Sequence, residues 1–497
     1  MELEFEKRGL TYLLPLLQEI QTQEQTQEIR LTDGMPDLGR ILGTWGQVIL
    51  RSKEWQGDRV SITGGVMAFV LYAPEDGGSP RTLESWIPFQ MKWNLEDGQR
   101  EGELRVQSLL RFLDARLVSA RKVMLRCGIS ARAQAFRQET AMVSIPGALP
   151  EDIQVLKSRY PLRLPKWAGE KPFLLEETVE LSQTAPDRKN LVSYSLEPRV
   201  SECRILSGKL VLRGNAGLHL VCLSGENRLE SHNLELPYSQ LVELEGEWNP
   251  DAQGNARVAV TGLEVESDPE GKIHVKANLL AQFLVNDREV VEVAEDVYST
   301  GRNVEPKWEE LNLCPILDQQ EIQVPVRQII RQNAGEIADV RYLPDFPVLH
   351  RGENVRVEMP GQFQVLWYDE NENLQSATAR TEEARELPAG EETRFLVSVT
   401  PGEMPTAGTG SGIELKGESL LEMTATSRRG LSVVTGLTIG EEMLRDHHRP
   451  SLILRRAGDA GLWQIAKNCG STVAAIQKAN GLEEEPTPER ILLIPVS

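Results

Sequence analysis

Short stretches in which apolar and polar residues alternate dominate the first 440 residues of this chain. The clearest stretch runs from 355 to 367, where one face would carry Val355, Val357, Met359, Phe363, Val365 and Trp367. Segments 60–72 and 210–222 alternate in the same way. Because successive side chains of a strand point to opposite faces, a period of two predicts half-buried β-strands. Residues 10–20 have weak helical spacing, which Pro15 interrupts.

One glycine occupies the same phase of each alternating segment, at Gly64, Gly214 and Gly361. A glycine inside a strand often marks a bulge or a close approach of another chain segment. Strands before and after these segments recur as well, so the pattern predicts one β-sandwich-like domain in three tandem copies. The expected domains are 1–150, 151–300 and 301–445, followed by a small domain at 446–497. Linkers are expected near 137–170 and 286–318, with extended strands that span neighbouring copies as the alternative.

Two smaller motifs accompany the copies. An apolar-Pro-aromatic motif follows the glycine in two of them, at 87–89 and at 236–238, whereas the third copy has Leu387-Pro388. A Pro-Lys-Trp sequence at 165–167 and at 306–308 precedes the second and third copies. We interpret the second motif as support for the domain boundaries.

The last fifty residues change to helical spacing. Four apolar positions follow the i, i+3, i+4, i+7 pattern of one helix face, namely Leu462, Ile465, Ala466 and Cys469. Asp459 is the expected N-cap of this helix and Gly470 its end, while Thr472 and Gly481 would bound a second helix. Strands are expected at 452–454 and 491–494. The segment therefore predicts a small βααβ domain.

This C-terminal segment resembles a LysM module, which binds cell-wall glycan or, in some proteins, a protein partner. The resemblance implies a shallow groove between two loops, lined here by Gly458, Asp459, Leu462, Trp463, Asn480, Gly481 and Leu482. A place in the hydrophobic core is the alternative for Leu462 and Trp463. The loop at 458–463 carries one inserted residue and lacks the usual hydroxyl, and 483–485 are glutamates. These departures weaken the expectation of glycan binding more than that of a protein partner.

Charge and composition exclude several classes of protein. The 497-residue chain has a formal net charge of −20, which argues against a nucleic-acid partner, because phosphates need clustered Lys and Arg. No apolar run is long enough for a membrane span, so no transmembrane segment is expected. Five widely spaced cysteines and the lack of a basic, apolar start predict a cytoplasmic protein.

Candidate chemistry is sparse. The six histidines form neither His-x-x-x-His nor Glu-x-x-His spacing, and the adjacent pair His447-His448 is expected in a solvated linker. The glycine-rich segment 408–412 precedes a strand, so a hairpin loop is expected there instead of a phosphate loop. Segment 369–373 is expected to be a polar turn, because it lacks features of a calcium-binding EF-hand loop. We expect no catalytic residues, no metal site and no cofactor.

Three such β units ahead of a C-terminal LysM resemble the SPOCS-domain family, the SipL-like spore coat proteins of endospore-forming Firmicutes. The first copy carries the resemblance best, in segments 31–47 and 87–93. The resemblance implies a non-catalytic structural adaptor in the mother-cell cytoplasm at the forespore surface, whose LysM docks to the ATPase of the coat's basement layer. The first alternative is a peptidoglycan-binding protein that recognises N-acetylglucosamine-containing glycan, and the second is an enzyme whose site assembles from distant residues. Period-two strands at sheet edges also predict possible self-association.

Overall fold

The computed structural model of the chain describes residues 2–95, 101–181, 190–224, 226–268, 271–388, 393–410, 412–427, 429–443 and 450–496. The chain is mainly β, as the alternating pattern predicts. Residues 10–20 belong to a strand, although they have helical spacing, because β2 (Glu6–Arg30) runs through them. Within the described ranges no helix has both the length and the apolar character that are needed to cross a membrane.

The strands of each predicted copy lie in two facing layers, which we call the first, second and third sheet pairs. One layer of the second pair and one layer of the third belong to a single seven-stranded sheet. In the first pair, one sheet has the order β2-β7-β6 and the other β3-β4-β5. Their bounds are β3 (Leu38–Gln56), β4 (Arg59–Pro74), β5 (Arg81–Asn94), β6 (Glu103–Ser119) and β7 (Lys122–Ile145). Buried side chains of both sheets form one hydrophobic cluster, so the two sheets share a core.

The second and third pairs repeat this order. The second joins β12-β13-β8 to β11-β10-β9, with bounds β8 (Ile153–Glu180), β9 (Asn190–Leu206), β10 (Lys209–Leu223), β11 (Leu229–Glu243), β12 (Gln253–Ser267) and β13 (Lys272–Ser299). In the third, β22 lies between β15 and the strands β20 and β21, and β18 pairs with β16, β17 and β19. The bounds are β15 (Ile316–Ile330), β16 (Glu336–Pro344), β17 (Val348–Arg351), β18 (Asn354–Tyr368), β19 (Leu374–Pro388), β20 (Thr393–Pro401), β21 (Thr406–Thr409) and β22 (Ile413–Ser427).

The recurrent glycine makes room for an aromatic ring of a neighbouring strand. Phe89 lies directly opposite Gly64, and Tyr238 directly opposite Gly214. A Cβ at Gly64 would lie 2.8 Å from the Phe89 ring, so a larger residue would displace it. In the third copy Tyr342 of the neighbouring strand β16 covers Gly361 instead, with its hydroxyl 2.5 Å from the Cβ position. This exchange explains why the third copy needs no apolar-Pro-aromatic motif.

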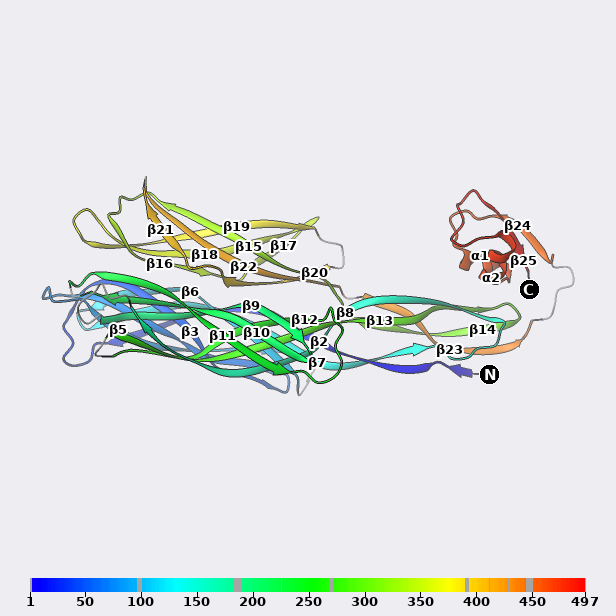
Figure 1. Cartoon of the computed structure of the whole chain (residues 1–497), viewed down its shortest axis with the longest axis horizontal. Coiled ribbons are helices and arrows are strands. Elements are labelled where there is room, and N and C mark those ends of the chain that lie inside the picture. Colours follow the sequence, from blue (N-terminus) through cyan, green and yellow to red (C-terminus); the bar gives the residue numbers. More distant parts are fainter. Residues whose placement is uncertain are drawn as a thin grey trace.

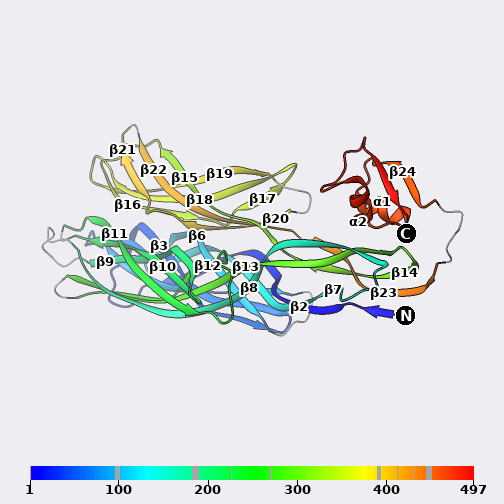
Figure 2. The ribbon, with the colours of Figure 1, turned by 45° about the vertical axis from the view of Figure 1, so that its right-hand side comes forward.

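The long strands continue beyond the sheet pairs as a stalk. The stalk consists of the β2 start paired with the β7 end, the β8 start paired with the β13 end, and β14 (Arg302–Leu313) paired with β23 (Arg429–Glu442). Figures 1 and 2 show these strands extending from the three sheet pairs toward the N-terminus. Apolar side chains of all three ribbons pack together inside it, including Leu10, Val143, Leu162, Val291, Leu311 and Val433.

Strands therefore occupy both segments that were expected to be linkers, 137–170 and 286–318. The linker prediction is wrong, and the alternative of extended strands is the one observed. Prolines and charged residues are frequent in these two segments, because the strand faces that point away from the stalk core are exposed to solvent. The two Pro-Lys-Trp sequences do not occupy equivalent places either. Trp167 packs near Phe283 in the second sheet pair, at a ring-centroid distance of 6.5 Å, whereas Trp308 is 48% exposed on the stalk.

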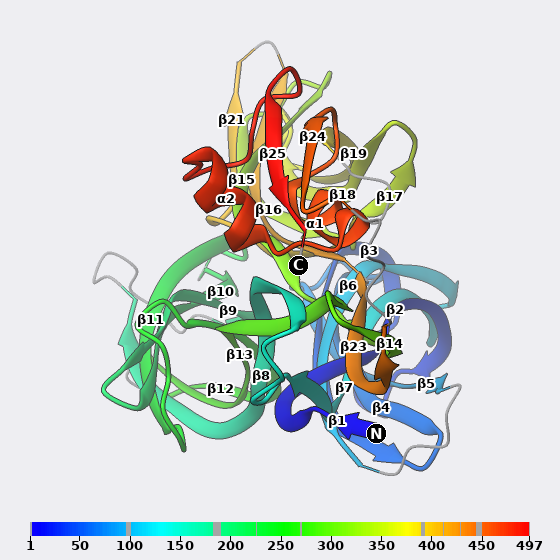
Figure 3. The ribbon, with the colours of Figure 1, turned by 90° about the vertical axis from the view of Figure 1, so that its right-hand side faces the viewer.

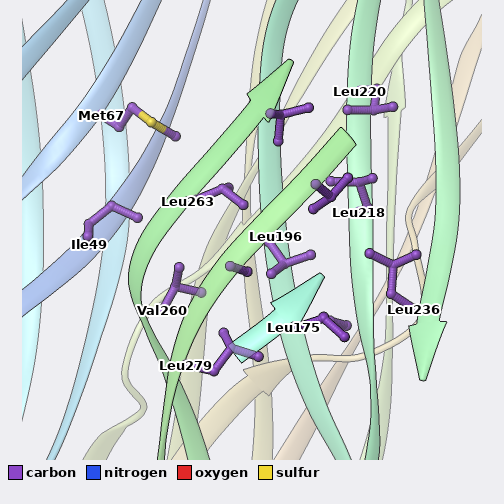
Figure 4. Packing of buried hydrophobic residues seen from close by; sticks show 14 of the residues in the cluster. Ile49, Met67, Leu175, Leu196, Leu218, Leu220, Leu236, Val260, Leu263 and Leu279 are labelled. Carbon is purple, nitrogen blue, oxygen red and sulfur yellow. The ribbon is translucent and has the colours of Figure 1, made fainter. Parts of the chain in front are cut away.

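The three sheet pairs surround a common long axis, as the view along that axis shows (Figure 3). They also share hydrophobic core. Ile49 of β3 and Met67 of β4 belong to the cluster that fills the second sheet pair (Figure 4). The division at 150, 300 and 445 stays a prediction, and the first and second sheet pairs bury apolar side chains in one shared cluster.

Residues 452–495 form a strand-helix-helix-strand unit, here called the C-terminal unit. It comprises β24 (Leu452–Arg456), α1 (Leu462–Cys469), α2 (Val473–Asn480) and β25 (Ile491–Pro495). The predicted apolar face of α1 is buried. Gly470 and Gly481 end the helices in the left-handed conformation, and the Thr472 hydroxyl accepts the Ala475 N–H, all as predicted. Figures 1 and 2 show this unit beside the stalk.

Candidate binding groove

Two loops of the C-terminal unit would form the predicted groove, and backbone hydrogen bonds hold them together. The first loop joins β24 to α1, and the second joins α2 to β25. The Ala457 N–H donates to the Arg490 carbonyl and the Gly458 N–H donates to the Pro488 carbonyl, each at 2.9 Å. Gly458 has a φ of 62° and is exposed, as is Asp459. The amide of Gly458 is thus already engaged within the unit.

Glu485 connects the same two loops through its side chain. Its Oε2 accepts the Leu462 N–H at 3.0 Å, at the first residue of α1. A carboxylate is favourable at this position, because the first N–H groups of a helix lack intrahelical partners and carry partial positive charge. The expectation that Asp459 caps α1 is wrong. The N-cap is Gly461, and the inserted residue leaves Asp459 two positions ahead of it.

Asn480 fastens the second helix to the last strand. Its Nδ2 donates to the Leu493 carbonyl at 2.6 Å, and its Oδ1 accepts the Leu493 N–H at 2.7 Å. These two hydrogen bonds have the donor-acceptor pattern of paired strands, and they engage both polar atoms of the Asn480 amide. Gly481 follows in the left-handed conformation, and Leu482 is half-buried against the core of the unit. Asn480 and Leu482 therefore support the second loop from within.

Leu462 and Trp463 do not face the space between the loops. Leu462 is 2% exposed and belongs to the core of the unit. Trp463 packs against the stalk. Its Nε1 donates to Asp296 Oδ2 at 2.8 Å, and its ring centroid lies 4.8 Å from that of Tyr298. Of the seven predicted groove residues, the structure leaves Gly458, Asp459 and Gly481 exposed on the two loops.

The contact of Trp463 belongs to a polar seam between the C-terminal unit and the stalk. Lys467 Nζ lies 2.8 Å from both carboxylate oxygens of Asp296, and the Tyr298 hydroxyl donates to the Ser471 carbonyl at 2.8 Å. Burial by itself raises the pKa of Asp296. The hydrogen bonds from Lys467 and Trp463 and the charge of Lys467 outweigh it, and leave that pKa below its ordinary value. Burial raises the pKa of Tyr298 to about 12, so the phenol stays protonated and can donate.

Sequence reasoning missed Asp296 and Tyr298, since both lie in a segment that was expected to be a linker. The alternation of β13 continues through Val291 and Val293, which are buried in the stalk. That period of two was the available signal for a strand. A partner for Trp463 could not be read from it, because the two segments are 167 residues apart.

A second polar contact joins the three sheet pairs near their common axis. Asp339 of β16 is 1% exposed and accepts the Trp45 Nε1–H at 2.7 Å, and His219 Nε2 lies 3.0 Å from its other oxygen. Trp45, His219 and Asp339 belong to the first, second and third pairs. Burial by itself raises the pKa of Asp339. The charge and hydrogen bond of His219, the hydrogen bond of Trp45 and the charge of Arg341 outweigh burial, so the pKa of Asp339 lies below its ordinary value.

The remaining candidate motifs have structural roles. Gly408 and Thr409 belong to β21, which pairs antiparallel with β22 and places Thr409 opposite Ile413, in keeping with the predicted hairpin; residue 411 lies outside the described residues. Asp369 Oδ1 accepts the N–H groups of Asn371 and Asn373 at 2.9 Å, which confirms the polar turn. His447 and His448 lie outside the described residues. In the part of the chain that the structure describes, no group of three or more His, Cys, Asp and Glu could hold a metal ion.

Comparisons with known proteins supply no functional assignment for this chain. No protein-family model, no curated protein and no solved structure matches it.

Proposed function

We propose that the protein is a non-catalytic structural adaptor in spore envelope assembly, and that its C-terminal unit docks to a protein of the coat's basement layer. The assignment to the spore coat rests on the resemblance to the SPOCS-domain family. One observation favours a protein partner over a glycan, namely the position of Glu485 across the predicted groove.

Glu485 changes what the groove can bind. A sugar N-acetyl group would need an unengaged backbone N–H as donor to its carbonyl. The amides of Gly458 and Leu462 already donate, to Pro488 and to Glu485. Exposed Glu483 and Glu484 precede Glu485 on the same loop. This acidic rim is complementary to Lys and Arg side chains of a protein surface, and charge complementarity promotes specific association.

The seam with the stalk supports an adaptor. Asp296, Tyr298 and Lys467 hold the C-terminal unit on a stalk whose strands β2, β7, β8 and β13 continue into the first and second sheet pairs. A partner that binds the unit is thereby held at a fixed place relative to the remaining surfaces of the molecule. Fixed spacing between separate surfaces is what an adaptor requires.

The test measures binding of the full chain to the purified basement-layer ATPase by surface plasmon resonance. Glu484→Lys should raise Kd about 2- to 5-fold, as expected for about 0.5–1 kcal/mol from an exposed charge pair. Glu19→Lys is the matched control, because it makes the same charge change at an exposed position of β2. Equal binding by the two variants would show that the acidic rim is not part of the interface. Absence of binding by the unmodified chain would contradict the proposed partner.

A further inference from the structure

Where the three sheet pairs meet, a group of arginines is buried. We call Arg105 of β6, Arg132 of β7 and Arg257 of β12 the arginine cluster. Arg105 is 3% and Arg132 is 2% exposed, and the Arg257 side chain is 12% exposed. Glu422 of β22 faces them from the third sheet pair, with its Oε2 3.0 Å from Arg257 Nη2. The cluster thus combines arginines of the first and second pairs, and the third pair supplies the carboxylate that faces them.

Positive charge exceeds negative charge in this cluster. Burial lowers the pKa of Arg105 and of Arg132 to about 9, so both remain charged at neutral pH. Burial raises the pKa of the nearby Cys203 thiol to about 12, so it contributes no negative charge. Glu321 pairs with Glu422 across β15 and β22, but it is exposed. Even with both carboxylates counted, the three guanidinium groups leave one positive charge uncompensated, which is unfavourable in a buried place.

The cluster also contains donors that are not used. Arg105 Nε, Arg132 Nη1 and Arg257 Nε are buried and have no hydrogen-bond acceptor among the described residues. Other nitrogens of the same side chains are engaged and fix their orientation. Arg105 Nη2 donates to Asn255 Oδ1 at 2.6 Å, and Arg257 Nη1 donates to Gln134 Oε1 at 3.0 Å. Arg132 Nη2 donates to the Val397 carbonyl.

A small cavity lies against two of these arginines. Its volume is about 40 Å³, and Arg105, Arg257 and Glu422 line it together with Gln134 and Asn255. Phe136, Leu284 and Leu396 form apolar parts of its wall. A cavity needs roughly 10–15 Å³ to hold one water molecule, so this one has room for a monatomic anion but not for a nucleotide or a sugar. Glu422 in the wall disfavours a multivalent oxyanion, whose charge would meet the carboxylate.

We propose that this cavity binds one small monovalent inorganic anion of the chloride type, between Arg105 and Arg257. The anion supplies the missing negative charge and accepts the unused Nε–H groups of Arg105 and Arg257. Water could accept these bonds as well, but it would leave the charge imbalance in place. Because the folded chain binds the anion and the unfolded chain does not, the anion stabilises the junction of the three sheet pairs by mass action.

The experiment follows the melting temperature of the full chain while chloride replaces gluconate at constant ionic strength. Gluconate is too large for the cavity, and constant ionic strength keeps surface screening equal in all samples. The melting temperature should rise with chloride and then saturate. An identical melting temperature at every ratio would overturn the proposal, and so would an equal rise with phosphate, because the site should select against it.

Two further measurements locate the effect. Arg105→Gln should abolish the chloride-dependent rise, whereas Arg30→Gln, at a side chain that is 74% exposed, should retain it. Because Arg105→Gln can also prevent folding, crystals of the unmodified chain soaked in bromide provide an independent test. An anomalous peak within hydrogen-bond distance of Arg105 Nε and Arg257 Nε is the expected result. Bromide peaks confined to the protein surface would overturn the assignment.

Discussion

Trp463 and Asp296 are 167 residues apart in the chain and share a hydrogen bond of 2.8 Å between Nε1 and Oδ2. This bond places the C-terminal unit on the stalk instead of leaving its tryptophan for an external ligand. Lys467 reinforces the contact from the same helix, with its Nζ 2.8 Å from the carboxylate. Asp296 of β13 therefore accepts the contacts of both Trp463 and Lys467, while Tyr298 holds the unit through Ser471.

Replacing that carboxylate should release the C-terminal unit. Asp296→Ala leaves the Trp463 and Lys467 donors without their acceptor, at a cost of about 1.5–3 kcal/mol, the range for hydrogen bonds to a charged group. Hydrogen exchange of α1 should accelerate, while exchange in the sheet pairs stays as in the unmodified chain. Asp114→Ala, at an exposed position of β6, is the control. Unchanged exchange in α1 would show that the seam does not depend on Asp296.

The same contact should weaken in acid. The pKa of Asp296 is lower in the folded chain than its unfolded value of about 3.9, so its contribution is complete above roughly pH 5 and is lost as pH falls through the folded pKa. Tryptophan fluorescence of the full chain, compared with that of Trp463→Phe, should report release of the Trp463 ring below about pH 4. Asp296→Asn should remove this transition. If the transition persists in Asp296→Asn, it arises from the titration of other carboxyl groups.

The recurrent glycine should not tolerate a side chain. A Cβ at Gly214 would collide with the Arg199 carbonyl and with the Tyr238 ring and hydroxyl, and overpacking of this kind costs about 1–3 kcal/mol. Urea denaturation of Gly214→Ala should show that loss. A Cβ at Gly408 would meet no described atom within 4 Å, so Gly408→Ala should change the free energy of unfolding by less than about 0.5 kcal/mol. Equal effects of the two substitutions would contradict the close approach of the tyrosine.

The contact among Trp45, His219 and Asp339 should be needed to join the sheet pairs. Asp339→Asn removes the buried carboxylate charge that lies 3.0 Å from His219 Nε2 and also attracts the Arg341 charge, and removing one partner of a buried ion pair costs about 3–5 kcal/mol. Denaturation monitored by fluorescence and by circular dichroism should shift to lower urea. Asp251→Asn, which touches Arg163 at a largely exposed site, should have a small effect. A loss below about 1 kcal/mol for Asp339→Asn would contradict this role.

Local patterns in the sequence predict the strands and most of the C-terminal unit well. Val355 to Trp367 forms β18, and Thr472, Gly470 and Gly481 occupy the helix boundaries as expected. These features depend on residues close in sequence, whose periodicity and capping chemistry are readable. The acidic cap of α1 escaped prediction because Glu485 reaches it from 23 positions away.

The stalk and its seam could not be predicted for a related reason. Alternation in β8, β13 and β14 shows that a strand exists there, but it does not show which ribbons pack together. Buried arginines were also missed, because the sequence gives no sign that Arg105, Arg132 and Arg257 converge from strands of two different copies. Contacts between distant segments position both the groove and the junction, and no local pattern records them.

The most direct test of the adaptor account compares two ligands for the same full-length chain. Co-sedimentation with purified peptidoglycan and binding to the purified basement-layer ATPase are measured in parallel, at one protein concentration and one ionic strength. Because Glu485 engages the Leu462 amide in the groove, the chain should remain in the supernatant with peptidoglycan. The adaptor account predicts that the same chain binds the ATPase saturably. Saturable sedimentation with peptidoglycan, together with no binding to the ATPase, would contradict the account.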